Sequence, residues 1–184
     1  MTQRETAQPT TEVPGRLRKL HGAVDAQLAE LATLTADATL FSSRSDKVSG
    51  WSIGQQIEHL VVVNETVLAK VEEVLAAEGD QKVGGLKPIG FVALTLGRFV
   101  RGVARAPRAT RPRDVDRTEM VERLGAQQEV WRAIGERLPA IAASKNRFPH
   151  PYFGGLTPAQ WIRFIGVHNR HHMRIIADIR KKAS

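Results

Sequence analysis

The chain contains no cysteine among its 184 residues. This absence excludes disulfide bonds, thiolate metal ligands and a cysteine nucleophile. Any transition-metal site in this protein must therefore be built from nitrogen and oxygen ligands.

Long hydrophobic runs are absent as well. Residues 89–103 are apolar but contain glycine, Arg98 and Arg101, so they fall short of the ~20 residues that span a bilayer. Residues 1–14 are polar and rich in threonine, unlike the apolar centre of a signal peptide. We expect residues 1–14 to form a flexible tail and the protein to be cytoplasmic, with no transmembrane segment.

The remaining chain has the composition of one globular domain, 42% hydrophobic and 25% charged, and we expect residues 15–184 to form it. Apolar residues recur every three or four positions in residues 16–34, 53–77, 118–138 and from 158 onward. A shorter helix is expected over residues 89–106, and no strand pattern competes. The pattern predicts an all-α fold, an up-down four-helix bundle with the shorter helix as an accessory element.

Three of the expected helix starts carry capping signals, in which a short polar side chain is followed three residues later by glutamine or glutamate. The pairs are Ser52 with Gln55, Asp116 with Glu119, and Thr157 with Gln160.

The last helix carries histidines on its apolar side. His168 and His172 are one turn apart, so both imidazoles can approach one point roughly 2.0 to 2.1 Å from each nitrogen. That arrangement is half of a metal site, although two hydrogen-bonded core histidines would show the same spacing. His171 lies near the edge of this face and fits a supporting or surface position better than a ligand.

Other polar side chains interrupt the apolar faces. His59 projects roughly 100° from the middle of its face, so it is either exposed or lines an opening between helices. Gln55 lies nearby and is a candidate contact to a metal ligand or to substrate, as are Gln128 and His171. Gln128 needs hydrogen-bond partners, either on a neighbouring helix or in a cavity. His150 belongs to the loop before the last helix and either packs against the end of the helices or approaches a cleft.

Six arginines crowd residues 98–113. A solvated surface is the simplest interpretation of this basic segment, and nucleic acid or an anionic membrane is the functional one. Arg98 and Arg101 are also candidates for binding the carboxylate or phosphate of a small substrate.

The segments "WSIGQQIEHL" and "HPYFGGLTPAQWIRFIGVHNRHHMRII" resemble the DinB and YfiT-like superfamily of metal-dependent enzymes, over about residues 15 to 182. The resemblance implies a four-helix bundle, frequently a homodimer, with one divalent metal held by His59, His168 and His172. It also implies thiol-dependent transfer or isomerisation, or hydrolysis, of a small-molecule substrate. Relatives often carry glutamine where this chain has Ile175, which weakens the case for catalysis more than the case for metal binding.

Three imidazoles would leave a coordination position open for substrate, and zinc, nickel and iron all accept such ligands. No carboxylate is expected on the metal side, since Glu58 and Glu65 point away from His59. This favours transfer of a low-molecular-weight thiol over hydrolysis. The alternative is a non-catalytic, metal-stabilised bundle that binds nucleic acid or another polyanion through its arginines.

Overall fold

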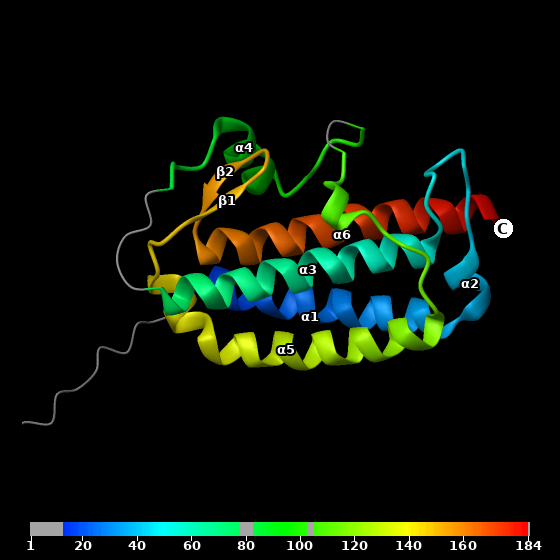
Figure 1. The fold of residues 1–184 in the computed structure, drawn as a ribbon, viewed down its shortest axis with the longest axis horizontal. Coiled ribbons are helices and arrows are strands. Elements are labelled where there is room, and N and C mark those ends of the chain that lie inside the picture. The colour runs from blue at the N-terminus through cyan, green and yellow to red at the C-terminus, as the bar shows by residue number, and fades with distance from the viewer. Residues whose placement is uncertain (1–12, 78–82, 103–104, 184) are drawn as a thin grey trace, which may run out of the picture.

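The computed structural model describes residues 13–77, 83–102 and 105–183, and it is mostly helical (Figure 1). The long helices are α1 (Gly15–Ala36), α3 (Ile53–Ala76), α5 (Arg117–Ala143) and α6 (Pro158–Ala183). The shorter elements are α2 (Ala38–Ser42), α4 (Pro88–Leu96), the 3-10 turn η1 (Arg108–Thr110), and the strands β1 (Phe148–His150) and β2 (Gly154–Leu156). Residues 1–12 of the expected tail lie outside the described residues. Val13, which was also expected in the tail, is described and packs against the core.

Two of the three predicted capping boxes are confirmed in full. The Ser52 hydroxyl accepts from the Gln55 backbone N–H at 3.1 Å, and the Gln55 side chain accepts from the Ser52 N–H at 3.0 Å. Thr157 and Gln160 make the same reciprocal pair at 2.9 and 3.4 Å. These contacts satisfy backbone donors that a helix start leaves free, and they set the first residues of α3 and α6.

The third box forms only by half. The Asp116 carboxylate accepts from the backbone N–H of Thr118 at 2.7 Å and caps α5. The Glu119 carboxylate does not return to Asp116, because it pairs with Arg113 at 2.7 Å. Asp116 therefore caps the helix alone, while Glu119 joins an ion-pair network.

The predicted helix over residues 89–106 is wrong in length, since α4 ends at Leu96. Gly97 follows with a φ of 63°, a left-handed conformation that suits glycine at a helix end. Helical spacing in the sequence continued past this glycine and gave no sign of the stop. The short helix α2 and the β1–β2 hairpin were also missed, because each is too short for a periodic signal.

The four long helices lie side by side (Figure 1). α1 packs against α5 and α6, and α3 packs against α6 and α5. α1 and α6 run in one direction, whereas α3 and α5 run in the other. The connection that contains α4 and η1 carries the chain back between α3 and α5, so strict up-down alternation is not confirmed.

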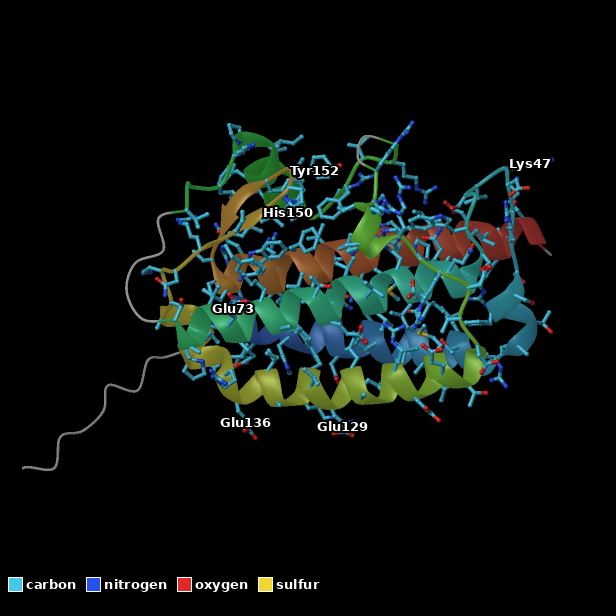
Figure 2. The ribbon with its side chains drawn as sticks, viewed as in Figure 1. Lys47, Glu73, Glu129, Glu136, His150 and Tyr152 are labelled. Carbon is cyan, nitrogen blue, oxygen red and sulfur yellow. The ribbon has the colours of Figure 1, made fainter. Side chains whose placement is uncertain are left out.

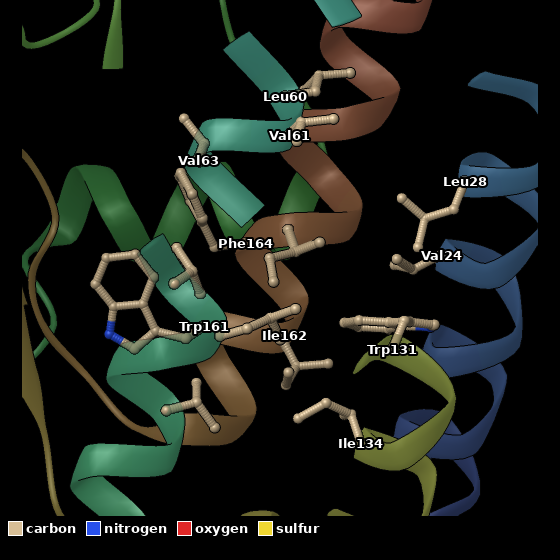
Figure 3. Close-up of a cluster of buried hydrophobic side chains, with 14 of the residues drawn as sticks. Val24, Leu28, Leu60, Val61, Val63, Trp131, Ile134, Trp161, Ile162 and Phe164 are labelled. Carbon is tan, nitrogen blue, oxygen red and sulfur yellow. The ribbon is translucent and has the colours of Figure 1, made fainter. Parts of the chain in front are cut away.

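The core combines apolar side chains from all four long helices (Figure 3). Trp131 and Ile134 of α5 approach Val24 of α1 and Ile162 of α6, and all four are buried. Each such side chain contributes about 1.5–3 kcal/mol by leaving water. The apolar periodicity of residues 118–138 includes Val121 as a core position, which is wrong: Val121 is 46% exposed, and its neighbour Met120 is fully buried in its place.

No helix within residues 13–77, 83–102 and 105–183 has both the length and the apolar character needed to cross a membrane.

Candidate metal centre

Three histidines from two helices converge between α3 and α6. His59 comes from α3, and His168 and His172 come from α6; one ring nitrogen of each lies within 4.8 Å of the others. The Nε2 atoms of His59 and His168 are 3.3 Å apart. Two nitrogens bound to one tetrahedral zinc at ~2.05 Å would be about 3.3 Å apart, so this pair fits a shared metal ion.

Two of the rings are held by hydrogen bonds on the nitrogen that faces away from this point. His59 Nδ1–H donates to the Thr110 carbonyl oxygen at 2.5 Å, and His172 Nδ1–H donates to the Gln56 side-chain oxygen at 2.7 Å. A proton held on Nδ1 leaves the Nε2 lone pair free to bind a metal. Both rings are therefore oriented and in the tautomer that a ligand needs.

His168 is held by ring packing instead. Its imidazole stacks on the Phe164 ring at 5.2 Å between centroids, with Phe99 at 6.1 Å. Its Nδ1 atom is shielded from solvent and has no hydrogen-bond partner in the described part of the chain. Leaving such a group unpaired costs about 1–3 kcal/mol. Buried polar atoms left unpaired are rare in native proteins, and this one is consistent with a histidine retained for function.

Burial lowers the pKa values of all three histidines. For His59 the Thr110 hydrogen bond partly opposes this effect, whereas for His168 and His172 the neighbouring histidines lower the pKa further. The three rings are therefore neutral at neutral pH. Neutral imidazole is the form that binds a metal, so the donor set fits a divalent cation.

The glutamine that supports the site is Gln56, although the sequence singled out its neighbour Gln55. The Gln55 side chain caps α3 and donates to the Asp114 carboxylate at 2.9 Å. Gln56 is buried and binds His172. Helical spacing contained the signal, because Gln56 precedes His59 by three residues and so lies on the same face.

On α5, too, the buried glutamine is the neighbour of the one that the sequence singled out. Gln128 is half-buried and makes no hydrogen bond to the three histidines among the described residues. Gln127 is the buried glutamine, donating to the Val61 carbonyl at 3.1 Å and accepting from Asn64 at 3.2 Å. The polar contact expected in the apolar face of α5 therefore ties α5 to α3.

His171 lies beside the centre. Its ring is 5.1 Å from that of His172 and 5.9 Å from that of Phe99. Burial and then the nearby Arg101 charge lower its pKa. The ring packs against a candidate ligand and is not one of the three converging groups.

The two arginines considered for anion binding differ in their surroundings. Arg101 pairs with Asp178 at 2.8 Å on the surface. Arg98 is exposed and has no ion pair among the described residues. Ile175 packs partly buried against the core, so this position supplies no polar group to the histidines.

A buried carboxylate holds the segment that supports His59. Glu58 is 1% exposed, and its oxygens lie 3.7 Å from Arg113 Nε and 3.5 Å from Arg123 Nη1. It also accepts from the Arg113 backbone N–H at 3.3 Å. These contacts fix the chain just after η1 on α3, which is how Thr110 is placed over His59.

His150 of β1 belongs to an aromatic cluster next to the centre. Its ring stacks on Phe153 at 4.3 Å and meets Phe164 edge-on at 4.9 Å. Its Nδ1 atom accepts from the backbone N–H groups of Tyr152 and Phe153 at 3.1 and 3.2 Å. Burial lowers the pKa of His150 to about 4, so the ring is neutral and carries its proton on Nε2.

A surface hollow of about 650 Å³ lies elsewhere, between α3 and α5. Leu68, Ala126 and Val130 are among its lining residues, and none of the three histidines lines it. The chemistry-bearing groups and this apolar hollow are therefore separate features.

Fold and site together define a mostly helical protein with a three-histidine group that can hold a metal ion. The chain belongs to the DinB superfamily, whose family model matches residues 19–176. It is also similar to the uncharacterized protein YuaE of Bacillus subtilis (strain 168), with 27% identity over 139 residues that cover 72% of this chain and 78% of YuaE. No solved structure matches the chain.

Proposed function

We propose that the protein is a metal-dependent enzyme that transfers a low-molecular-weight thiol to, or isomerises, a small-molecule substrate. The observation that carries this proposal is the convergence of three neutral imidazoles, two of which have the opposite nitrogen held by a hydrogen bond. His59, His168 and His172 would hold the ion. A divalent ion in such a site supplies Lewis acidity, lowering the pKa of a water or thiol that reaches it.

The lack of a free carboxylate favours thiol transfer over hydrolysis. In the described part of the chain, no carboxylate makes a hydrogen bond or ion pair with the three histidines. Glu58 is committed to Arg113 and Arg123. A hydrolase benefits from a carboxylate base that deprotonates water, whereas a thiol has a much lower intrinsic pKa and needs less help.

The residues around the histidines would shield and orient the reactants. Phe99 and Phe164 cover the His168 side and restrict water. His150 presents a neutral ring with its proton fixed on Nε2, which is suited to donating a hydrogen bond to a substrate oxygen without changing charge.

The assembly that accompanies this proposal is a four-helix bundle that acts as a cytoplasmic homodimer. The packing of the four long helices supports the bundle, whereas the homodimer and the cytoplasmic location are carried over from the resemblance to the DinB superfamily. Analytical ultracentrifugation of the full chain tests the homodimer directly.

The first experiment is elemental analysis of protein purified without a histidine tag and dialysed against Zn²⁺ or Ni²⁺. We expect about one ion per chain, as one three-histidine site predicts, and loss of the ion in H168A and H172A. The variant H171A is the matched control, because it removes a neighbouring histidine of the same helix and is expected to keep the ion. A parent protein without bound metal would overturn the proposal.

The second experiment separates the two reactions. The loaded protein is incubated with a small thiol and electrophilic substrates, and consumption of free thiol is measured beside hydrolysis of ester and amide substrates. Thiol consumption that is lost in H168A supports thiol transfer. Hydrolysis that proceeds without thiol would show instead that the protein is a hydrolase.

The second candidate function is a non-catalytic bundle that binds nucleic acid or another polyanion. The observation behind it is the group of exposed arginines around η1, of which Arg105 and Arg108 make no ion pair in the described residues. A salt-dependent shift of a nucleic-acid probe, lost in R105Q/R108Q, would favour it.

A further inference from the structure

The net charge of the protein comes from one segment. Residues 81–113 contain eight lysines and arginines and no acidic residue, whereas the other 19 basic residues are matched by 19 acidic ones. The formal charge of +8 is therefore concentrated in the connection that carries α4 and η1. Such a segment produces a strong local field on an otherwise balanced molecule.

Most of these cations are not neutralised by neighbours. Arg101 pairs with Asp178, and Arg113 pairs with Glu58 and Glu119. The other basic residues that the structure describes here are exposed and have no acidic partner within the described ranges. They are Lys87, Arg98, Arg105, Arg108 and Arg111.

The same segment exposes most of the large apolar side chains that face solvent. Helix α4 buries Gly90 and Leu94 against the protein, yet its outer side is apolar as well. Six of the eight exposed large hydrophobic residues in the described chain lie here or on the adjoining hairpin. They are Ile89, Phe91, Val92, Leu96, Val100 and Tyr152. A helix that is apolar all round is normally covered on all sides, so this one lacks a partner.

The apolar and basic residues belong to one connection and its adjoining hairpin, which lie on one side of the long helices (Figure 1), and we call them the α4 surface. Tyr152 and His150 mark its hairpin edge in Figure 2, while Glu129 and Glu136 project from α5 on the opposite side of the molecule. The hydroxyl of Tyr152 donates to the Arg105 carbonyl at 3.1 Å and so joins the hairpin to the basic segment. The α4 surface is therefore basic and apolar, whereas the basic residues of α5 are matched by an equal number of acidic ones.

We propose that the α4 surface docks on the anionic surface of a lipid bilayer. Exposed Leu96 and Val100, 68% and 75% accessible, would enter the headgroup region while the surrounding arginines bind lipid phosphates. Nucleic acid would satisfy the arginines but leave the aliphatic side chains in contact with water. A second copy of the chain would cover the aliphatic side chains but bring two sets of unpaired arginines together.

Docking in this way would place the histidine centre close to the lipid. Phe99 belongs to the same segment and packs inward on His168 and His171, while its neighbour Val100 faces solvent. The docking proposal itself does not depend on the metal or on the proposed reaction.

The test is co-sedimentation of the full chain with vesicles of phosphatidylcholine alone or with added phosphatidylglycerol. The parent protein is expected to bind only the anionic vesicles. The variant L96S/V100S is expected to bind at least about tenfold more weakly, because two aliphatic side chains no longer leave water. Its matched control is V121S/V130S, which removes two exposed apolar side chains, 46% and 50% accessible, from α5 and is expected to bind like the parent.

The charge arm compares R105Q/R108Q with R16Q/R18Q on α1. Loss of two arginines at the surface is expected to weaken binding about 30-fold, whereas the same loss on α1 changes it less than twofold. Equal vesicle binding by L96S/V100S and the parent would overturn the proposal, since charge alone would then explain it. The proposal would also be overturned if the parent did not bind vesicles and L96S/V100S changed from dimer to monomer. It would likewise be overturned if nucleic acid displaced the protein from the vesicles. The variant H168A is expected to bind vesicles normally, so failure of the metal proposal and failure of docking are distinguishable.

Discussion

The helix pairs α1–α5 and α3–α6 are alike in length but enclose different chemistry. Between α1 and α5, Trp131 is buried, and its indole stacks on His21 and donates to the His21 carbonyl. α3 and α6 instead contribute six of the nine buried polar side chains in the described residues. They are Gln56, Glu58, His59, Asn64, Asn169 and His172. Burying polar groups costs free energy, so the helix pair that holds the candidate metal centre carries most of this cost, whereas α1 and α5 pack mainly apolar side chains.

The largest loss of stability is expected from a substitution between α1 and α5, where the contact is mainly apolar. W131A removes a buried indole together with its contact to His21, and we expect a loss of about 3–5 kcal/mol in the free energy of unfolding. Chemical denaturation followed by circular dichroism measures it. V130A, at the exposed neighbouring position, is the control and should change stability by less than ~0.5 kcal/mol. The comparison fails if both variants are equally stable.

The helix pair α3–α6, which carries the three histidines, should make the free energy of unfolding depend on pH. The pKa values of His59, His168 and His172 are lowered in the folded protein from the ordinary 6.5, so the unfolded chain takes up protons first as the pH falls. Stability is therefore full above about pH 6.5 and falls below it, by about 2–4 kcal/mol between pH 7 and 5.5 for the three groups together.

Denaturant unfolding with a chelator present, so that no metal contributes, measures this dependence. The variant H168A lacks one of the three groups, and its stability should fall less steeply over the same range. If the stability of H168A depended on pH as steeply as that of the parent, His168 would not contribute to the pH dependence as expected.

The support of His172 can be tested by removing its acceptor. Q56L keeps the side-chain size but leaves the His172 Nδ1–H unpaired, and we expect metal affinity to fall about 10–100-fold. Competition with a chromophoric chelator measures the affinity. Q55L is the matched control: it should lose about 1 kcal/mol of stability with its cap and keep the affinity within about twofold. Equal effects of the two variants would contradict the assignment of Gln56.

A smaller effect is expected for the carboxylate behind the centre. E58Q weakens the contacts to Arg113 and Arg123, which loosens the segment that presents the Thr110 carbonyl to His59. Metal affinity should fall about tenfold, as for other groups that orient a ligand indirectly. The control E65Q lies on the same helix as Glu58 and weakens an exposed ion pair with Arg123 of α5, and it should leave the affinity unchanged. A normal affinity in E58Q would show that the segment is held without this carboxylate.

Local signals in the sequence predicted much of the fold. The capping boxes at Ser52 and Thr157 and the apolar periodicity located the starts of α3 and α6, because these signals depend on residues within one or two turns. The length of α4 was not predictable in the same way. Its end depends on the left-handed conformation of Gly97, and a glycine in an apolar run is also compatible with a continuing helix.

The candidate site also has one part that local sequence signals predicted and one part that they did not. The spacing of His168 and His172 required only the geometry of one helix, so the sequence alone determined that these side chains share a face. Their meeting with His59 depends on the packing of α6 against α3, which only the tertiary structure decided. The Thr110 carbonyl could not be predicted at all, because every residue carries one and only the folded chain determines which carbonyl reaches a histidine.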